Sequence, residues 1–180
     1  MEELALPRDP QGFVRRQCPH CRRQFKTRPS SLDGASLQQA LAQAVTHQNL
    51  DDQRASLKRW VCFYCGKSSA PEEYLTLEHR GWVNRVATAL AERVRYEQLS
   101  HVTRTLAQNP RPTFVPMRPP PLPGVLPMEP DDMRRFLMLC CGDEVKAATG
   151  WQQRYHCPRC GTEHDGGRPI PKMPLRLVPE

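Results

Sequence analysis

The cysteines of this chain come in pairs, and this pattern constrains the fold more than any other feature. All 8 cysteines fall into four pairs, of which three have the form Cys-x-x-Cys and the fourth is adjacent. Paired thiolates are a common way of presenting sulfur to a tetrahedral metal ion. In chain order, the pairs predict two four-sulfur sites. Site one has the spacing C-x2-C-x40-C-x2-C, and site two has the spacing C-C-x15-C-x2-C; their members are Cys18, Cys21, Cys62 and Cys65, and Cys140, Cys141, Cys157 and Cys160.

The residues around the pairs are typical of metal-binding knuckles, the tight turns that hold two ligands. Gly66 and Gly161 each follow the second cysteine of a pair, where glycine lets the backbone turn around the ion and point amides at the sulfurs. The runs Cys18-Pro19-His20-Cys21 and Cys62-Phe63-Tyr64-Cys65-Gly66 resemble the knuckles of the zinc-ribbon class. The resemblance covers these two knuckles alone, and it implies structural Zn²⁺ held by short β-hairpins.

The first half of site two departs from the knuckle pattern. A regular knuckle ending at Cys141-Gly142 would need cysteine at position 138, where Met138 stands. Adjacent cysteines can bind one ion, although their side chains alternate in direction along the backbone. We therefore expect Cys140 and Cys141 to act together with Cys157 and Cys160. In the alternative, one of the adjacent pair is a core thiol, and His156 or His164 completes the site.

Composition supports metal ions in place of a large core. Hydrophobic residues make up 38% and aromatic residues 7% of the 180 residues. A structural zinc ion contributes roughly 10–16 kcal/mol of folding free energy per site, which would offset a small apolar core. The sequence has neither an apolar run long enough to cross a membrane nor a signal pattern at its start. We therefore expect a cytoplasmic protein without membrane association, whose thiols stay reduced.

The fold class expected is α+β, with two small zinc ribbons joined by a long amphipathic helix and a proline-rich linker. The linker carries 9 of the 19 prolines and is expected to be extended. The expected segments are 1–70 (first ribbon, with a helical insertion at about 36–60), 71–108 (helix), 109–130 (linker), 131–165 (second ribbon) and 166–180 (irregular tail).

The long helix is predicted to begin at about Glu72 or Thr76 and to end near Gln108. Thr76, or the acidic pair Glu72 and Glu73, can cap its start. Apolar residues at three- and four-residue spacing form one stripe along it: Trp82, Val83, Val86, Leu90, Val94, Leu99, Val102 and Leu106. This stripe is longer than one small ribbon can cover. It packs on segment 36–60 and the second ribbon, or it binds a protein partner.

Basic residues crowd the first knuckle, and no acidic residue lies between positions 10 and 32. The total charge is a weaker signal, because two four-thiolate zinc sites lower the formal value from +7 to about +3. Phe13 and Phe25 are interleaved with the basic residues, as in proteins that stack nucleic-acid bases. The candidate nucleic-acid contacts are Arg15, Arg16, Arg22, Arg23, Lys26 and Arg28.

No recognisable catalytic motif accompanies the cysteines. Cys18-Pro19-His20-Cys21 is identical to the redox tetrapeptide of a thiol oxidase, but no βαβ pattern of a thioredoxin fold surrounds it. Four-thiolate sites also leave no open position for hydrolysis. We therefore expect a non-enzymatic adaptor or scaffold subunit with protein partners and no small-molecule substrate. The alternative is nucleic-acid binding through the basic first knuckle.

Overall fold

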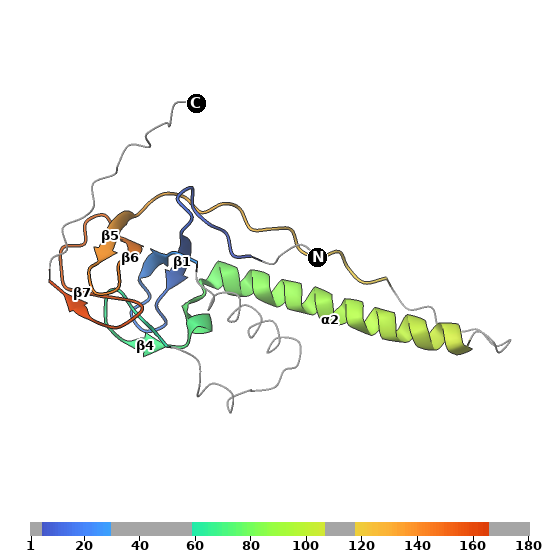
Figure 1. The fold of residues 1–180 in the computed structure, drawn as a ribbon. Helices are drawn as coiled ribbons and strands as arrows, with labels where there is room; N and C mark the ends of the chain where they lie inside the picture. Colours follow the sequence, from blue (N-terminus) through green and yellow to red (C-terminus); the bar gives the residue numbers. More distant parts are fainter. Residues whose placement is uncertain (1–4, 30–58, 107–117, 166–180) are drawn as a thin grey trace.

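The structure is a computed structural model that describes residues 5–29, 59–106 and 118–165. Within these residues the fold is α+β, as predicted, with one long helix and short antiparallel strands. The strands gather at one end of helix α2, which projects away from them (Figure 1). The elements in chain order are β1 (Val14–Gln17), β2 (Gln24–Thr27), β3 (Trp60–Val61), β4 (Ser68–Ser69), the 3-10 helix η2 (Pro71–Tyr74), α2 (Leu77–Leu106), β5 (Arg134–Met138), β6 (Asp143–Ala147), β7 (Tyr155–His156) and β8 (Glu163–His164).

Two hairpins from distant parts of the chain share the main sheet, whose strand order is β1-β2-β6-β5. They join because β2 pairs antiparallel with β6, in a register that sets Lys26 opposite Lys146. The sequence placed segments 1–70 and 131–165 in separate ribbons, whereas the structure brings both into one sheet. A two-stranded hairpin is marginal in water, and pairing through the inner strands gives each hairpin a further partner.

The two shorter strand pairs, β3–β4 and β7–β8, also meet across the two halves of the fold. Val61 donates its N–H to the carbonyl of Pro158 at 2.9 Å, and His156 donates to the carbonyl of Phe63 at 2.8 Å. The two bonds are equivalent. In each, the donor is the residue before the first cysteine of one Cys-x-x-Cys turn, and the acceptor is the residue after the first cysteine of the other turn. Each half therefore consists of a hairpin and a shorter strand pair, and an approximate two-fold axis relates the halves.

The core lies between the two halves and is largely aromatic. Phe63 stacks on Tyr155 with ring centroids 5.0 Å apart, and its edge meets Tyr64 at 5.1 Å. Cysteines of both sites belong to the same buried cluster, so the candidate metal centres continue the core. The other buried members include Phe25, Trp60, Tyr74, Phe136, Met138, Val145 and Ala147.

Helix α2 begins at Leu77, directly after Thr76, which is one of the two starts named from the sequence. The Thr76 hydroxyl accepts a hydrogen bond from the N–H of His79 at 3.1 Å, which caps the first turn. The residues before it form η2 rather than the start of α2. Trp82, Val83 and Val86 are buried in a second apolar cluster against the sheet side of the fold. No helix in the described parts of the chain is both long enough and apolar enough to cross a membrane.

The described part of the proline-rich segment, residues 118–130, forms neither helix nor strand. It runs back along α2 toward β5 (Figure 1). The indole N–H of Trp82 donates to the carbonyl of Gly124 at 2.8 Å, and Leu126 packs against the second apolar cluster. This segment therefore docks on the first half of α2. Residues 36–58, 109–117 and 166–180, to which the sequence analysis also assigned structure, lie outside the described residues.

Candidate metal centres

Four turns in the described residues share one backbone hydrogen bond. In each, the N–H of the residue after a cysteine donates to the carbonyl four residues earlier, and the donor has a positive φ. Such a turn points its amides inward, as a metal-binding knuckle requires. The four bonds are Arg22 to Cys18 (3.0 Å, φ 62), Gly66 to Cys62 (3.1 Å, φ 68), Gly142 to Met138 (2.7 Å, φ 68) and Gly161 to Cys157 (2.9 Å, φ 78).

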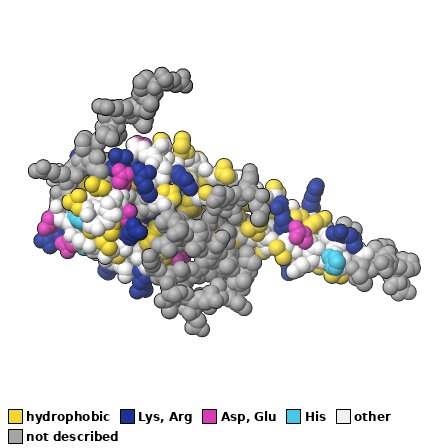
Figure 2. Space-filling model, in the orientation of Figure 1, with side chains coloured by type: hydrophobic (Ala, Val, Ile, Leu, Met, Phe, Trp, Pro, Cys, Tyr) yellow, Lys and Arg dark blue, Asp and Glu magenta, His cyan; other side chains and the backbone are white. Residues whose placement is uncertain are grey.

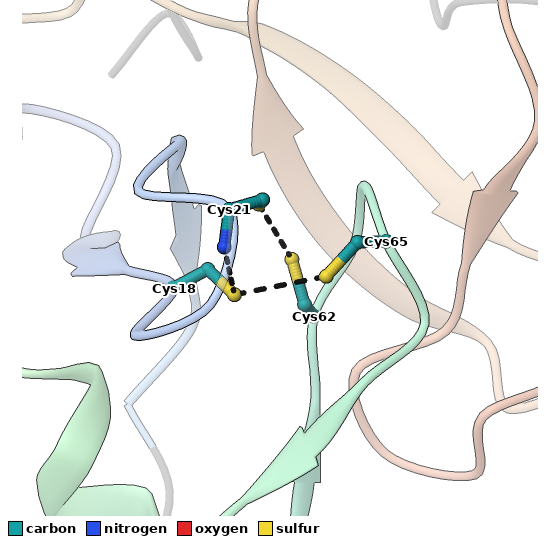
Figure 3. A group of neighbouring side chains, drawn as sticks. All are labelled: Cys18, Cys21, Cys62 and Cys65. Carbon is teal, nitrogen blue, oxygen red and sulfur yellow. Dashed lines mark hydrogen bonds between the residues drawn. The ribbon is translucent and has the colours of Figure 1, made fainter.

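Site one brings together the sulfurs of the β1–β2 turn and the β3–β4 turn (Figure 3). The Sγ atoms of Cys18 and Cys65 are 3.8 Å apart, and those of Cys21 and Cys62 are 3.7 Å apart. All four sulfurs lie within 4.8 Å of one another. A regular tetrahedron with Zn–S bonds of about 2.3 Å has sulfurs about 3.8 Å apart. The donor set of site one therefore fits a tetrahedral ion.

The electrostatics of site one favour a bound cation. Burial tends to raise the pKa of Cys18, but the N–H groups of Cys21 and His20, each 3.4 Å from its sulfur, lower it below its usual value. Burial raises the pKa of Cys62, and the nearby Cys18 adds to the rise. Thiolates this close repel one another, and a divalent ion between them relieves the repulsion. Soft thiolate donors select Zn²⁺ or a similar soft cation.

Site two unites the β5–β6 turn with the β7–β8 turn. Cys140, Cys141, Cys157 and Cys160 form a group of four sulfurs within 4.8 Å of one another. The Sγ atoms of Cys140 and Cys160 are 3.4 Å apart. Hydrogen bonds with the side chain and N–H of Thr162 lower the pKa of Cys160 to about 6, while burial raises that of Cys157 to about 11. This donor set also suits a metal ion.

The histidines near the sites take different positions. His164 Nε2 lies 3.3 Å from the Cys140 sulfur, and its ring stacks on Tyr155 at 5.1 Å. The His156 ring instead lies against Gly66, on the opposite half of the fold. His20 is exposed, and its Nε2 is 3.0 Å from the Ser69 hydroxyl. Of the two alternative ligands named from sequence, His164 is the one beside the sulfurs.

Met138 occupies the place of a first knuckle cysteine, since its carbonyl accepts the same hydrogen bond as that of Cys18. We predict that Cys140→Ser releases the ion of site two, and that adding Met138→Cys restores it through a regular Cys-x-x-Cys turn. Native mass spectrometry counts the ions. The matched control is Leu139→Cys with Cys140→Ser, because Leu139 is 79% exposed and points its side chain into solvent. Equal rescue by both double variants would contradict the assignment.

The glycine after a knuckle allows a second prediction. Gly66 and Gly142 both have φ +68, but a Cβ on Gly66 would lie 2.8 Å from the His156 ring, whereas Gly142 has open space. Gly142→Ala should cost only the left-handed backbone penalty, about 1–2 kcal/mol. Gly66→Ala should cost about 1–3 kcal/mol more, because it displaces a packed ring. Urea unfolding measures both, and equal losses would show that the contact is unimportant.

Most of the basic residues near the first knuckle have partners inside the protein. Arg16 is buried, and its guanidinium lies 4.5 Å from the centre of the Trp60 ring. The Arg28 guanidinium pairs with Glu144 at 2.5 Å. Arg22 and Arg23 are exposed, and neither has a carboxylate partner among residues 5–29, 59–106 and 118–165.

The remaining two candidates, Arg15 and Lys26, belong to a partly buried ion cluster at the approximate two-fold axis. Arg15 donates to Glu129 at 2.6 Å and to Asp132 at 2.7 Å. Lys26 is fully buried, bonds to the carbonyl of Pro130 and lies 3.0 Å from Asp132. Burial tends to raise the pKa of Asp132, but hydrogen bonds from Arg15 and Lys26 lower it.

The second half of this cluster surrounds Lys146, which pairs with Asp9 at 2.5 Å and with Asp131 at 2.6 Å. Burial would raise the pKa of Asp9, yet the bond from Lys146 and the N–H of Phe13 lower it overall. The role of these carboxylates was not predicted from the sequence. Their signal was the acidic run Glu129-Pro130-Asp131-Asp132 directly before β5, which balances the basic run of the first hairpin.

The described part of the chain thus holds two groups of four cysteines able to bind metal ions, built on one repeated turn. Comparisons with protein-family models, with curated proteins and with solved structures found no match to this chain.

Proposed function

We propose that this protein is a non-enzymatic, cytoplasmic zinc-binding scaffold, in which a fused pair of zinc ribbons holds two structural Zn²⁺ ions and presents helix α2 to a protein partner. The observation that carries the proposal is the projection of α2 beyond the strands and the two cysteine sites. Within residues 77–104 the last buried residue of the helix is Ala89, although α2 continues to Leu106.

The chemistry of the two sites supports a structural role for the ions. Four thiolates complete the coordination sphere of a tetrahedral ion and leave no position for water or substrate. All four cysteines of site one, and Cys141 and Cys157 of site two, lie in or pack against the cluster that forms the aromatic core. Zinc binding then contributes directly to folding, since the four-ligand geometry does not exist in an unfolded chain.

The outer half of α2 supports a role in binding. A helix of 30 residues is about 45 Å long, and the strands lie at only one end of it (Figure 1). Val94 is 52% exposed and Val102 is 50% exposed. Figure 2 shows hydrophobic side chains interspersed with basic and acidic ones along this part of the molecule. A helix can bind a partner by laying apolar side chains in a groove of that partner, and the two exposed valines are the side chains that would do so here.

A photo-reactive amino acid at position 94 or 102 tests this proposal in cells that produce the protein. Both positions should crosslink the same partner, while position 77, an exposed leucine at the start of α2, should not. The purified partner should then bind Val94→Glu/Val102→Glu about tenfold or more weakly. Failure to crosslink, an adduct with a second copy of this chain, or unchanged affinity of the double variant would refute the proposal.

A second candidate function, nucleic-acid binding, rests on Arg22 and Arg23. Both are exposed on the first knuckle, and Arg23 lies 4.8 Å from the ring of Trp151, which is half-buried. Binding to single-stranded DNA and RNA should then weaken steeply with salt. Each lost phosphate contact in Arg22→Ala/Arg23→Ala should reduce the log–log salt slope by about 0.7. The control is Arg85→Ala/Arg93→Ala on α2; equal slopes for both variants would exclude this surface.

A further inference from the structure

The two candidate metal centres differ in how their sulfurs meet solvent. In site one, Cys18 and Cys62 are 0% exposed, and the other two cysteines are half-buried. In site two, Cys140 and Cys160 are both exposed. Reactions of thiolates with solutes depend on access as well as on thiolate character. Site two is therefore the centre that a small oxidant in solution can reach.

The same two exposed sulfurs lie close together. Their Sγ atoms are 3.4 Å apart, and the Cys21–Cys62 and Cys18–Cys65 contacts of site one are 3.7 and 3.8 Å. They come from turns of two different hairpins, β5–β6 and β7–β8, so a bond between them would link two segments of the fold. A disulfide needs an S–S distance of about 2.0 Å, so its formation requires the two exposed side chains to bring their sulfurs about 1.4 Å closer.

We propose that Cys140 and Cys160 form an oxidant-sensitive pair, whose conversion to a disulfide releases the ion of site two and leaves site one loaded. The inference rests on the proposed zinc function. The oxidant class is a peroxide. Disulfide formation would make site two a modification site, while site one keeps a purely structural role.

The reaction balances with one peroxide. One thiolate attacks a peroxide oxygen, the O–O bond breaks, and the departing hydroxide takes a proton to become water, which leaves a sulfenic acid. The second thiolate attacks that sulfur, the S–S bond forms, and the sulfenic oxygen leaves with a proton as a second water. The two sulfurs lose two electrons to the peroxide. The zinc ion loses two of its four ligands and dissociates.

Peroxide titration followed by native mass spectrometry tests the inference under non-reducing conditions. The untreated protein should carry two zinc ions. One equivalent of hydrogen peroxide should remove one ion, and peptide mapping should find Cys140 linked to Cys160. Thiol reductant with added Zn²⁺ should restore two ions. Fewer than two ions before treatment would refute the zinc proposal itself. Two ions before treatment, with both lost together or with another cysteine pair linked, would refute this inference alone.

A variant that keeps four ligands provides the matched control. Met138→Cys/Cys140→Ser moves one ligand from an exposed position to a position where the native side chain is 0% exposed. We expect this variant to bind two ions and to release the second about tenfold more slowly at equal peroxide, because the sulfur is shielded. Release at the wild-type rate would contradict the role of exposure.

Discussion

Replacing Cys62 with serine should unfold the β-strands and the aromatic core that lies between them. Cys62 is fully buried within the aromatic core, and its loss leaves site one with three sulfurs. A structural zinc site supplies roughly 10–16 kcal/mol, which is comparable to the total stability of about 5–15 kcal/mol of a typical domain. Circular dichroism and near-ultraviolet spectra of the variant should therefore resemble those of the unfolded chain at 25 °C.

The informative comparison is Cys160→Ser, which removes an exposed ligand of site two. We expect this variant to lose one ion and to keep the near-ultraviolet signal of the aromatic core, because Cys160 lies outside the buried cluster to which Cys62 belongs and site one keeps all four sulfurs. A Cys62→Ser protein that unfolds at the wild-type urea concentration would show that site one contributes no folding free energy.

Asp9→Asn should be the most damaging substitution away from the cysteines. Asp9 is buried, and its carboxylate lies 2.5 Å from Lys146 and 3.7 Å from Lys26. The asparagine keeps the shape but removes the negative charge, so two buried ammonium groups lose a common partner. Removing one member of a buried ion pair costs about 3–5 kcal/mol, and we expect a loss near the lower end because Asp131 and Asp132 still pair with the two ammonium groups.

Urea unfolding at constant zinc concentration measures this effect. The control is Glu163→Gln, whose carboxylate pairs with Arg154 at 3.1 Å while the two side chains are 47% and 72% exposed. Exposed pairs contribute about 0–1 kcal/mol. Similar losses for both variants would mean that water reaches the Asp9 cluster and that it is not a buried electrostatic centre.

The sequence was informative about features encoded by neighbouring residues. Cysteine spacing gave the members of both sulfur groups, and Thr76 marked the start of the long helix through its own side-chain hydrogen bond. The helix start depends on a contact within a few residues. The sulfur groups could be predicted because paired cysteines have few roles other than binding metal. The α+β class followed from the same local patterns.

The arrangement of the halves was not accessible from sequence, because it depends on contacts between distant segments. The β2–β6 pairing joins hairpins whose sequences share little beyond Lys26 and Lys146, so periodicity gives no sign of it. The basic run of the first hairpin looked like a binding surface for the same reason: Glu129 and Asp132, which pair with Arg15 and Lys26, lie more than one hundred residues later in the chain.

Metal removal under reducing conditions tests most directly whether bound ions hold this fold together. Denaturing and native mass spectra should first show two zinc ions per chain. Excess chelator should remove both, and the near-ultraviolet signal of the aromatic core should disappear and return when Zn²⁺ is added back. A chain purified with less than one equivalent of zinc, or an aromatic core that survives complete chelation, would contradict the account.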